Sequence, residues 1–167
     1  ARIYSKKGEH QKVVDTIQKI WNAKGYDPDQ LQNFLTSVDY LEGINAALKV
    51  LDHIEESEET IRIKSLFLGR AGRLDEAIAI AHDQIEKQPS VTANYRRLGL
   101  LRKWQANDPL IDQMRKLDKD ASIPGRSQVD LGYALSKSLE DIGEYKEAFA
   151  AISKANRIQK LELGDRK

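Results

Sequence analysis

The segments GRLDEA (Gly72–Ala77) and GEYKEA (Gly143–Ala148) decide the fold, because both follow one pattern. Each has a glycine suited to a turn, then an apolar residue, a glutamate and an alanine small enough to lie between two helices. The two glycines are 71 residues apart, and weaker copies of the pattern begin at Val38 and Gly8. Their spacing indicates a period near 34 residues, which predicts one helical hairpin per repeat and an all-α solenoid.

The residues around these turns resemble the tetratricopeptide repeat (TPR) family over nearly the whole chain. Pro89 follows Gly72 by 17 residues, where a TPR unit usually breaks, and Tyr95, Leu98 and Gly99 resemble the Trp-x-x-Leu-Gly signature that opens the next unit. Three positions depart from the pattern: Val38 for a turn glycine, Gly43 for a small alanine and Lys160 for a proline. The resemblance implies an all-α, α-solenoid fold of helix-turn-helix hairpins in a right-handed superhelix.

We predict one TPR-like domain over residues 1–167, in units of roughly 1–25 (partial), 26–57, 58–91, 92–128 and 129–163. Helices are expected near residues 9–24, 28–37, 39–55, 58–71, 74–87, 91–105, 109–119, 128–142 and 144–162. Candidate N-caps are Asp27, Ser57, Ser90, Asp108 and Ser127, and candidate C-cap glycines are Gly25, Gly72, Gly143 and Gly164. Because the first unit is incomplete and the chain starts without methionine, we expect a fragment of a longer protein.

Composition excludes several classes of function. The chain has 27 Lys+Arg against 26 Asp+Glu and a net charge of +1, which gives no overall attraction to nucleic acid. It has no cysteine, which excludes disulfides and thiolate metal sites, and its three histidines lack metal-site spacing. No apolar run reaches the ~20 residues that a membrane-spanning helix needs. We therefore expect a cytoplasmic protein with no metal and no cofactor.

Catalytic signals are weak as well. The acidic cluster around Ser57 is typical of a solvated helix start, where carboxylates oppose the helix dipole. The segment Gly69–Gly72 lies between two expected helices and is not a phosphate-binding loop. The sequence predicts a protein that is not an enzyme.

The last third has a narrower resemblance. Residues Asn107–Gly164, with LEDIG at Leu139–Gly143 and the pair Ala148-Phe149 before Asn156, resemble the TPR region of bacterial TPR-fused sulfotransferases. This implies a parent protein with a sulfuryl-transfer domain, which this chain lacks. A regulatory or recognition region of a sulfotransferase-like enzyme is therefore our alternative hypothesis.

In TPR folds the first helix of each hairpin lines the concave face, and carrying this over implies seven partner-binding residues: Arg62, Leu66, Arg96, Leu100, Lys103, Tyr133 and Lys137. Four of them are cationic, and the stretch Thr92–Arg126 carries eight basic against four acidic residues. Acidic peptides or a C-terminal carboxylate suit such arginines through charge-assisted hydrogen bonds. The carboxylate clamp of some TPR domains does not fit, because Leu66 and Ala134 occupy two of its places.

The first hypothesis is therefore a non-catalytic protein–protein interaction or scaffold module that binds a peptide or protein segment in a partly basic concave groove. Nucleic acid is a poorer candidate partner, because Trp104 beside Arg102 and Lys103 is better explained by packing at a helix end. Self-association through the ends of the solenoid is a further alternative.

Overall fold

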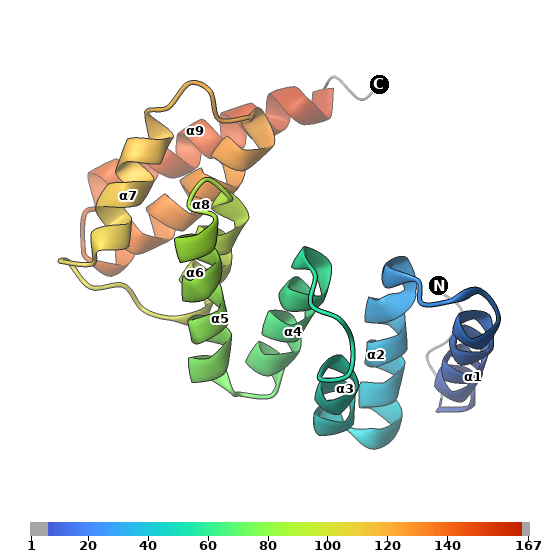
Figure 1. Cartoon of the computed structure of the whole chain (residues 1–167). Helices are drawn as coiled ribbons and strands as arrows, with labels where there is room; N and C mark the ends of the chain where they lie inside the picture. The colour runs from blue at the N-terminus through green and yellow to red at the C-terminus, as the bar shows by residue number, and fades with distance from the viewer. Residues whose placement is uncertain (1–6, 165–167) are drawn as a thin grey trace. The chain divides into compact units, whose positions relative to one another are not determined.

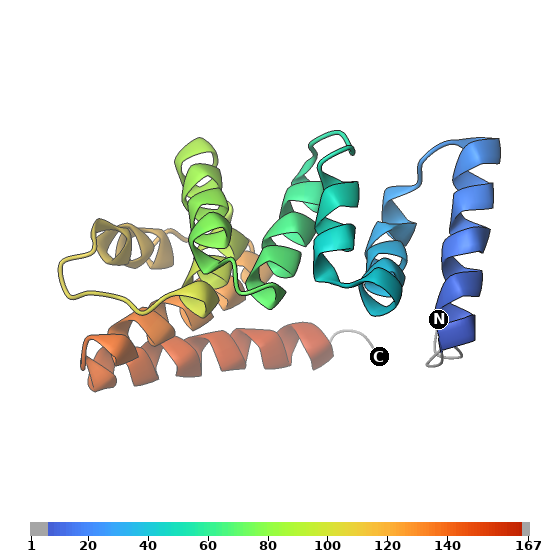
Figure 2. The same ribbon diagram turned by 90° about the horizontal axis from the view of Figure 1, so that it is seen from below.

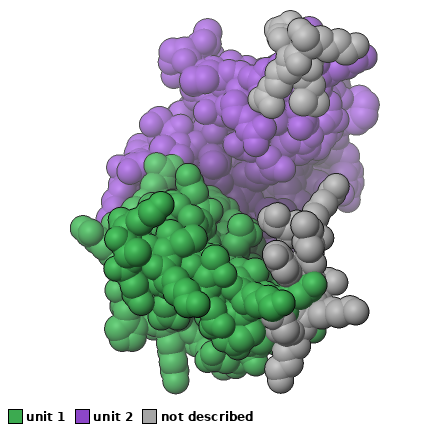
Figure 3. All heavy atoms as spheres, turned by 90° about the vertical axis from the view of Figure 1, so that its right-hand side faces the viewer, with its two compact units in different colours: residues 1–77 green, residues 78–167 purple. Residues whose placement is uncertain are grey.

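The computed structural model describes residues 7–164, and all regular structure in that range is α-helical. The helices are α1 (Lys7–Lys24), α2 (Pro28–Glu42), α3 (Ile44–Leu51), α4 (Glu58–Arg70), α5 (Leu74–Lys87), α6 (Thr92–Leu101), α7 (Pro109–Asp118), α8 (Gly125–Asp141) and α9 (Tyr145–Gly164). The prediction of an all-α fold is confirmed. The chain divides into two compact units, residues 1–77 and 78–167 (Figure 3). A single domain over the whole chain, and the hand of a superhelix, stay predictions.

In the first unit, helices that follow one another along the chain pack together: α1 on α2, α2 on α3 and α3 on α4 (Figure 1). Leu31, Phe34 and Leu35 of α2 are buried at helical spacing, which gives this helix one apolar face. Its start is fixed by Asp27, whose carboxylate accepts from the backbone N–H of Asp29 at 3.0 Å, with Pro28 in the first turn. Local sequence and packing thus agree on where α2 begins.

The hairpin turn predicted at Val38 is wrong. Helix α2 continues to Glu42, and the turn lies at Gly43. Its φ of 89° is a backbone angle that glycine adopts readily and other residues rarely adopt. Val38 is buried, seven residues after Leu31 on the same apolar face. The repeat pattern misplaced the turn by five residues because burial at Val38 favours continuing the helix. The copy at Gly8 likewise lies inside α1, whereas Gly25, Gly72 and Gly143 have positive φ at helix ends as predicted.

In the second unit α8 and α9 form a tight hairpin and run side by side in both ribbon views (Figures 1 and 2). They come so close at Gly132 that a Cβ there would lie 2.7 Å from the Cβ of Ala155. Helices α6 and α7 pack on α8. A shared core joins these helices: Ala81, Ile85, Tyr95, Leu98, Trp104, Ile111, Met114, Leu131, Ala134, Leu135, Leu139, Ala148 and Ala151. Tyr95 and Leu98, which matched the repeat signature, are therefore core residues.

Helix α6 ends at Leu101 and not near residue 105. Trp104 lies beyond the helix, buried, and its backbone N–H donates to the Asp141 carboxylate at 3.2 Å. Two predicted N-caps are also wrong. Val91, not Ser90, occupies the cap position of α6, and Ser127 lies inside α8, which begins after Pro124.

Candidate partner-binding groove

A groove of about 260 Å³ lies between α6 and α8. Its lining comes from α6, α8 and one residue of α9: Arg96, Gly99, Leu100, Tyr133, Ala134, Ser136, Lys137, Glu140 and Ile152. We call it the α6–α8 groove. Four of the seven predicted partner-binding residues line it: Arg96, Leu100, Tyr133 and Lys137. The structure thus brings these four together within one unit.

Helix periodicity explains this lining. Arg96, Gly99 and Leu100 are three and four residues apart on α6, so they share one face. Tyr133 and Lys137 are four apart on α8, and Glu140 continues the same row. Leu100, near the end of the α6 row, is 80% exposed.

Arg96 crosses from α6 to α8. Its Nη1 donates to Asp130 Oδ1 at 2.6 Å, and its guanidinium lies 4.8 Å from the centre of the Tyr133 ring. The Tyr133 hydroxyl lies 2.8 Å from the side-chain oxygens of both Asn156 and Gln159 on α9. These contacts hold Arg96 and Tyr133 in place along the groove.

Lys137 is paired with Asp141 one turn further along α8, and its Nζ donates to Asp141 Oδ1. Burial raises the pKa of Asp141, but the hydrogen bonds from Lys137 and from the Trp104 backbone N–H outweigh it, so the pKa is lowered overall. Asp141 is therefore a carboxylate that fixes both the groove lysine and the segment after α6.

In both ion pairs the cation faces solvent and the acid lies beneath it. The Arg96 side chain is 42% exposed against 13% for Asp130, and Lys137 is 44% exposed against 9% for Asp141. A molecule entering the groove would meet these two cations and the exposed Glu140, while Asp130 and Asp141 lie beneath the cations. The buried acids pre-orient these cations, which reduces the entropy lost when they bind an anion.

The other three predicted residues do not line this groove. Lys103 is exposed in the connection after α6, because the helix stops earlier than predicted. Arg62 and Leu66 lie on α4 in the first unit. Arg62 donates to both carboxylate oxygens of Glu59, at 2.6 and 2.8 Å, and these hydrogen bonds raise its pKa. A surface shared by all seven residues stays a prediction.

The local positive charge of Thr92–Arg126 is largely compensated in space. Arg115 of α7 donates to Glu144 at 2.6 Å and to Glu147 at 2.8 Å, both outside that stretch. Asp130 of α8 similarly pairs with an arginine of α6. A count along the sequence misses these acids because they come from α8, from the turn after it and from α9.

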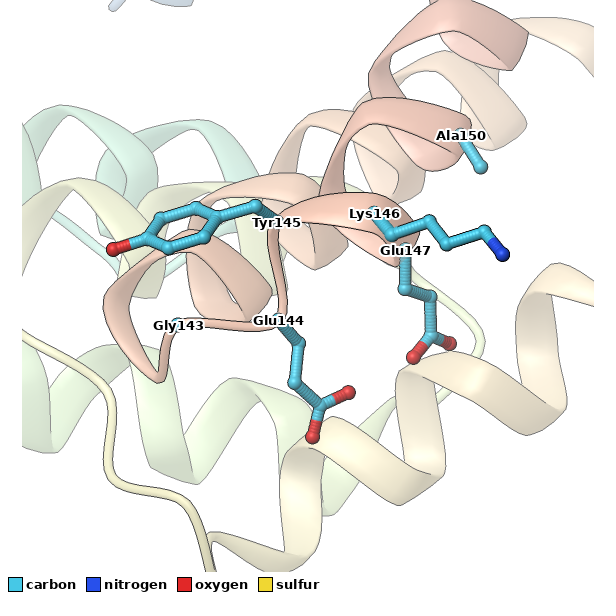
Figure 4. Close-up of a pocket in the computed structure, with 6 residues that line it drawn as sticks. All are labelled: Gly143, Glu144, Tyr145, Lys146, Glu147 and Ala150. Atoms are coloured by element: carbon cyan, nitrogen blue, oxygen red, sulfur yellow. The ribbon is translucent and has the colours of Figure 1, made fainter.

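A larger depression of about 610 Å³ lies at the start of α9 (Figure 4). Its lining is one continuous segment, Gly143 to Glu147, together with Ala150, so no second helix supplies an opposite wall. Glu144 and Glu147, which point to the same side in the close-up, are both bound by Arg115. With a single wall, this depression is a poorer candidate site than the α6–α8 groove.

The His10 side chain packs against α2. His10 stacks on Tyr40 with ring centres 4.2 Å apart, and its Nδ1 lies 3.1 Å from Ser37 Oγ. Within residues 7–164 no group of three or more His, Asp or Glu side chains could hold a metal ion.

None of the helices in that range is long and apolar enough to cross a membrane.

Comparison with known proteins supports the fold. No family model matches the chain, and no curated protein does. A crystal structure of MamA is similar, with a TM-score of 0.54 and 18% sequence identity over 95% of this chain and 93% of that chain. A double mutant of MamA RS-1 gives a TM-score of 0.53 at 15% identity, covering 93% of this chain and 88% of that chain. MamA MSR-1 gives 0.51 at 17% identity, covering 93% and 90%.

These similarities show an all-α, TPR-like array of helices packed in sequential pairs, as in MamA. They add nothing to the sulfotransferase resemblance of Asn107–Gly164, which stays a prediction from sequence.

Proposed function

We propose that this protein is a non-catalytic interaction module that binds an acidic peptide segment of another protein in the α6–α8 groove. The observation that carries the proposal is the arrangement of Arg96 and Lys137, two exposed cations on neighbouring helices with their acidic partners beneath them. Guanidinium and ammonium groups bind carboxylates by charge-assisted hydrogen bonds, which are about twice as strong as neutral ones.

The size of the groove favours a peptide over a small metabolite. Small-molecule sites usually measure roughly 300–1,000 Å³ and enclose most of the ligand. A groove of about 260 Å³ with the highly exposed Leu100 at its edge suits side chains that enter from an extended partner. The TPR-like fold supports the same conclusion, because such arrays present extended surfaces to protein partners.

Neutralising the two cations tests the proposal. We predict that Arg96→Gln with Lys137→Gln weakens binding of a fluorescein-labelled Glu-Gly decapeptide at least tenfold, because two charge-assisted hydrogen bonds are lost. Glutamine keeps a donor for the buried acids, so the fold should persist. Fluorescence anisotropy gives the affinity, and circular dichroism checks the helices.

Lys146→Gln with Lys160→Gln is the matched control, because both lysines are exposed on α9 and do not line the groove. Equal losses in the two double variants would show that only net charge matters. Unchanged affinity after the Arg96 and Lys137 substitutions would contradict the proposal.

The sulfotransferase alternative concerns the parent protein. A nucleotide-binding α/β domain following this region in the full-length sequence would favour it, and the groove would then recognise a substrate protein of that enzyme. A parent without such a domain would remove this alternative.

A further inference from the structure

A row of residues on α9 extends the α6–α8 groove beyond its cationic residues. Tyr145, Phe149, Ile152, Asn156 and Gln159 are spaced by four, three, four and three residues, so they form one stripe along the helix. We call it the α9 stripe. Ile152 lines the groove, and Asn156 and Gln159 hold the hydroxyl of Tyr133, another lining residue. The α9 stripe therefore borders the groove at Ile152, and Phe149 continues it along the same helix face beyond the lining residues.

Two large apolar side chains of this stripe are uncovered. Phe149 is 73% exposed and Tyr145 is 69% exposed, one and two turns before Ile152. Leu100 adds a third exposed apolar side chain from α6 at the opposite wall. Burying side chains of this size removes apolar surface from water, which favours binding.

The packing of α8 against α9 places Phe149 level with Lys137. Gly132 of α8 lies against Ala151 and Ala155 of α9, and the two helices run antiparallel in the hairpin. Lys137 is five residues further along α8, so it lies beside the α9 residues about five positions before that contact, around Phe149. Charged and apolar side chains thus lie close together along the groove: Arg96 and Leu100 on α6, Lys137 on α8 and Ile152 on α9, with Phe149 near the level of Lys137.

From this arrangement we infer that the bound segment carries bulky apolar side chains next to its carboxylates, and that Phe149 is their main contact. The inference rests on the proposed function and specifies its ligand. Carboxylates bound at the half-exposed sides of Arg96 and Lys137 would place neighbouring apolar side chains near Leu100, Ile152 and Phe149. The groove volume of about 260 Å³ suits an aromatic ring, since an apolar cavity of ~150 Å³ holds benzene.

The test compares two labelled peptides that differ only in apolar content, one alternating Glu with Phe and one alternating Glu with Ser. Phe149→Ala should weaken binding of the Glu-Phe peptide about tenfold and leave the Glu-Ser peptide unchanged, as expected for an apolar hot spot. Leu161→Ala is the matched control. Leu161 is 65% exposed on α9 but lies outside the stripe, so its loss should change neither affinity.

The outcomes separate the inference from the function on which it rests. If the Arg96 and Lys137 substitutions abolish binding while Phe149→Ala leaves the Glu-Phe affinity unchanged, the inference is wrong and the acidic-peptide function stands. If the wild-type protein binds neither peptide, both are wrong. Equal effects of Phe149→Ala and Leu161→Ala would also overturn the inference, because general surface hydrophobicity would then explain the binding.

Discussion

Gly132 and Gly99 both lie in helices, but they differ in the space available for a side chain. A Cβ at Gly132 would lie 2.7 Å from the Cβ of Ala155 and 3.1 Å from the carbonyl oxygen of Ala151. At Gly99 the nearest atom would be Trp104 Nε1 at 3.5 Å, an ordinary contact. The first glycine allows close helix packing, whereas the second leaves room for a methyl group.

Each glycine replaced alone by alanine should therefore change the free energy of unfolding, in opposite directions at the two positions. We predict that Gly132→Ala lowers the free energy of unfolding by about 1–3 kcal/mol through overpacking. Gly99→Ala should raise it by roughly 0.5–1 kcal/mol, because alanine loses less conformational entropy in a helix. Urea unfolding followed by circular dichroism measures both, and a Gly132→Ala variant as stable as wild type would contradict the close packing of α8 and α9.

Asp141 should make stability depend on pH. Because its folded pKa lies below its ordinary value of 3.8, its charge stabilises the fold fully above that value. This contribution is lost as the pH falls through the lower folded pKa. We predict that Asp141→Asn costs about 1–3 kcal/mol at pH 7 and less at a pH below 3.8. Urea unfolding of the variant and the wild type at the two pH values measures this cost. An equal cost at both pH values would show that the charge of the Asp141 carboxylate does not contribute to stability.

At the scale of helices, only Ser57 forms its cap among the three serine caps predicted from sequence, Ser57, Ser90 and Ser127. Ser57 Oγ accepts from the Thr60 N–H at 3.2 Å, and Thr60 Oγ1 accepts from the Ser57 N–H at 2.7 Å, which is a reciprocal capping box. Ser90 makes no such cap, because α6 begins one residue later.

We predict that Ser57→Ala lowers the free energy of unfolding by about 1 kcal/mol, because the first turn of α4 loses its cap. Ser90→Ala is the matched control and should stay within about 0.5 kcal/mol of wild type. Chemical denaturation of the two variants gives the comparison. Equal losses of unfolding free energy in the two variants would contradict the capping box that the structure shows at Ser57.

Sequence predicted the helices well where a local signal and burial agree. Asp27-Pro28 and Asp108-Pro109 mark helix starts, and Gly72 and Gly143 mark turns, because cap chemistry and positive φ are local properties. The turn at Val38 was misplaced because burial of that side chain depends on tertiary packing. The end of α6 was misplaced for the same reason, since Trp104 leaves the helix to enter the core.

The groove was partly predictable. Arg96 and Asp130 are 34 residues apart, which is the repeat period, so equivalent positions of successive units could have suggested this pair. The contact from Trp104 to Asp141 and the contribution of Ile152 had no such signal, because they depend on how α6 ends and how α9 packs.

At the scale of the whole molecule, the TPR-like fold shown by the similarity to MamA is compatible with many partners. Self-association through the ends of the array would make the molar mass rise with concentration. Light scattering over a hundredfold range measures this directly, and a constant monomer mass would remove that alternative.

The central claim is that the α6–α8 groove receives an acidic segment of another protein. Backbone amide chemical shifts of the ¹⁵N-labelled chain, followed while the Glu-Phe peptide is added, test it most directly. We predict that the shifted amides cluster around Arg96 and Leu100 on α6 and around Tyr133 and Lys137 on α8. Shifts confined to helices outside the groove, or none at millimolar peptide, would contradict the account.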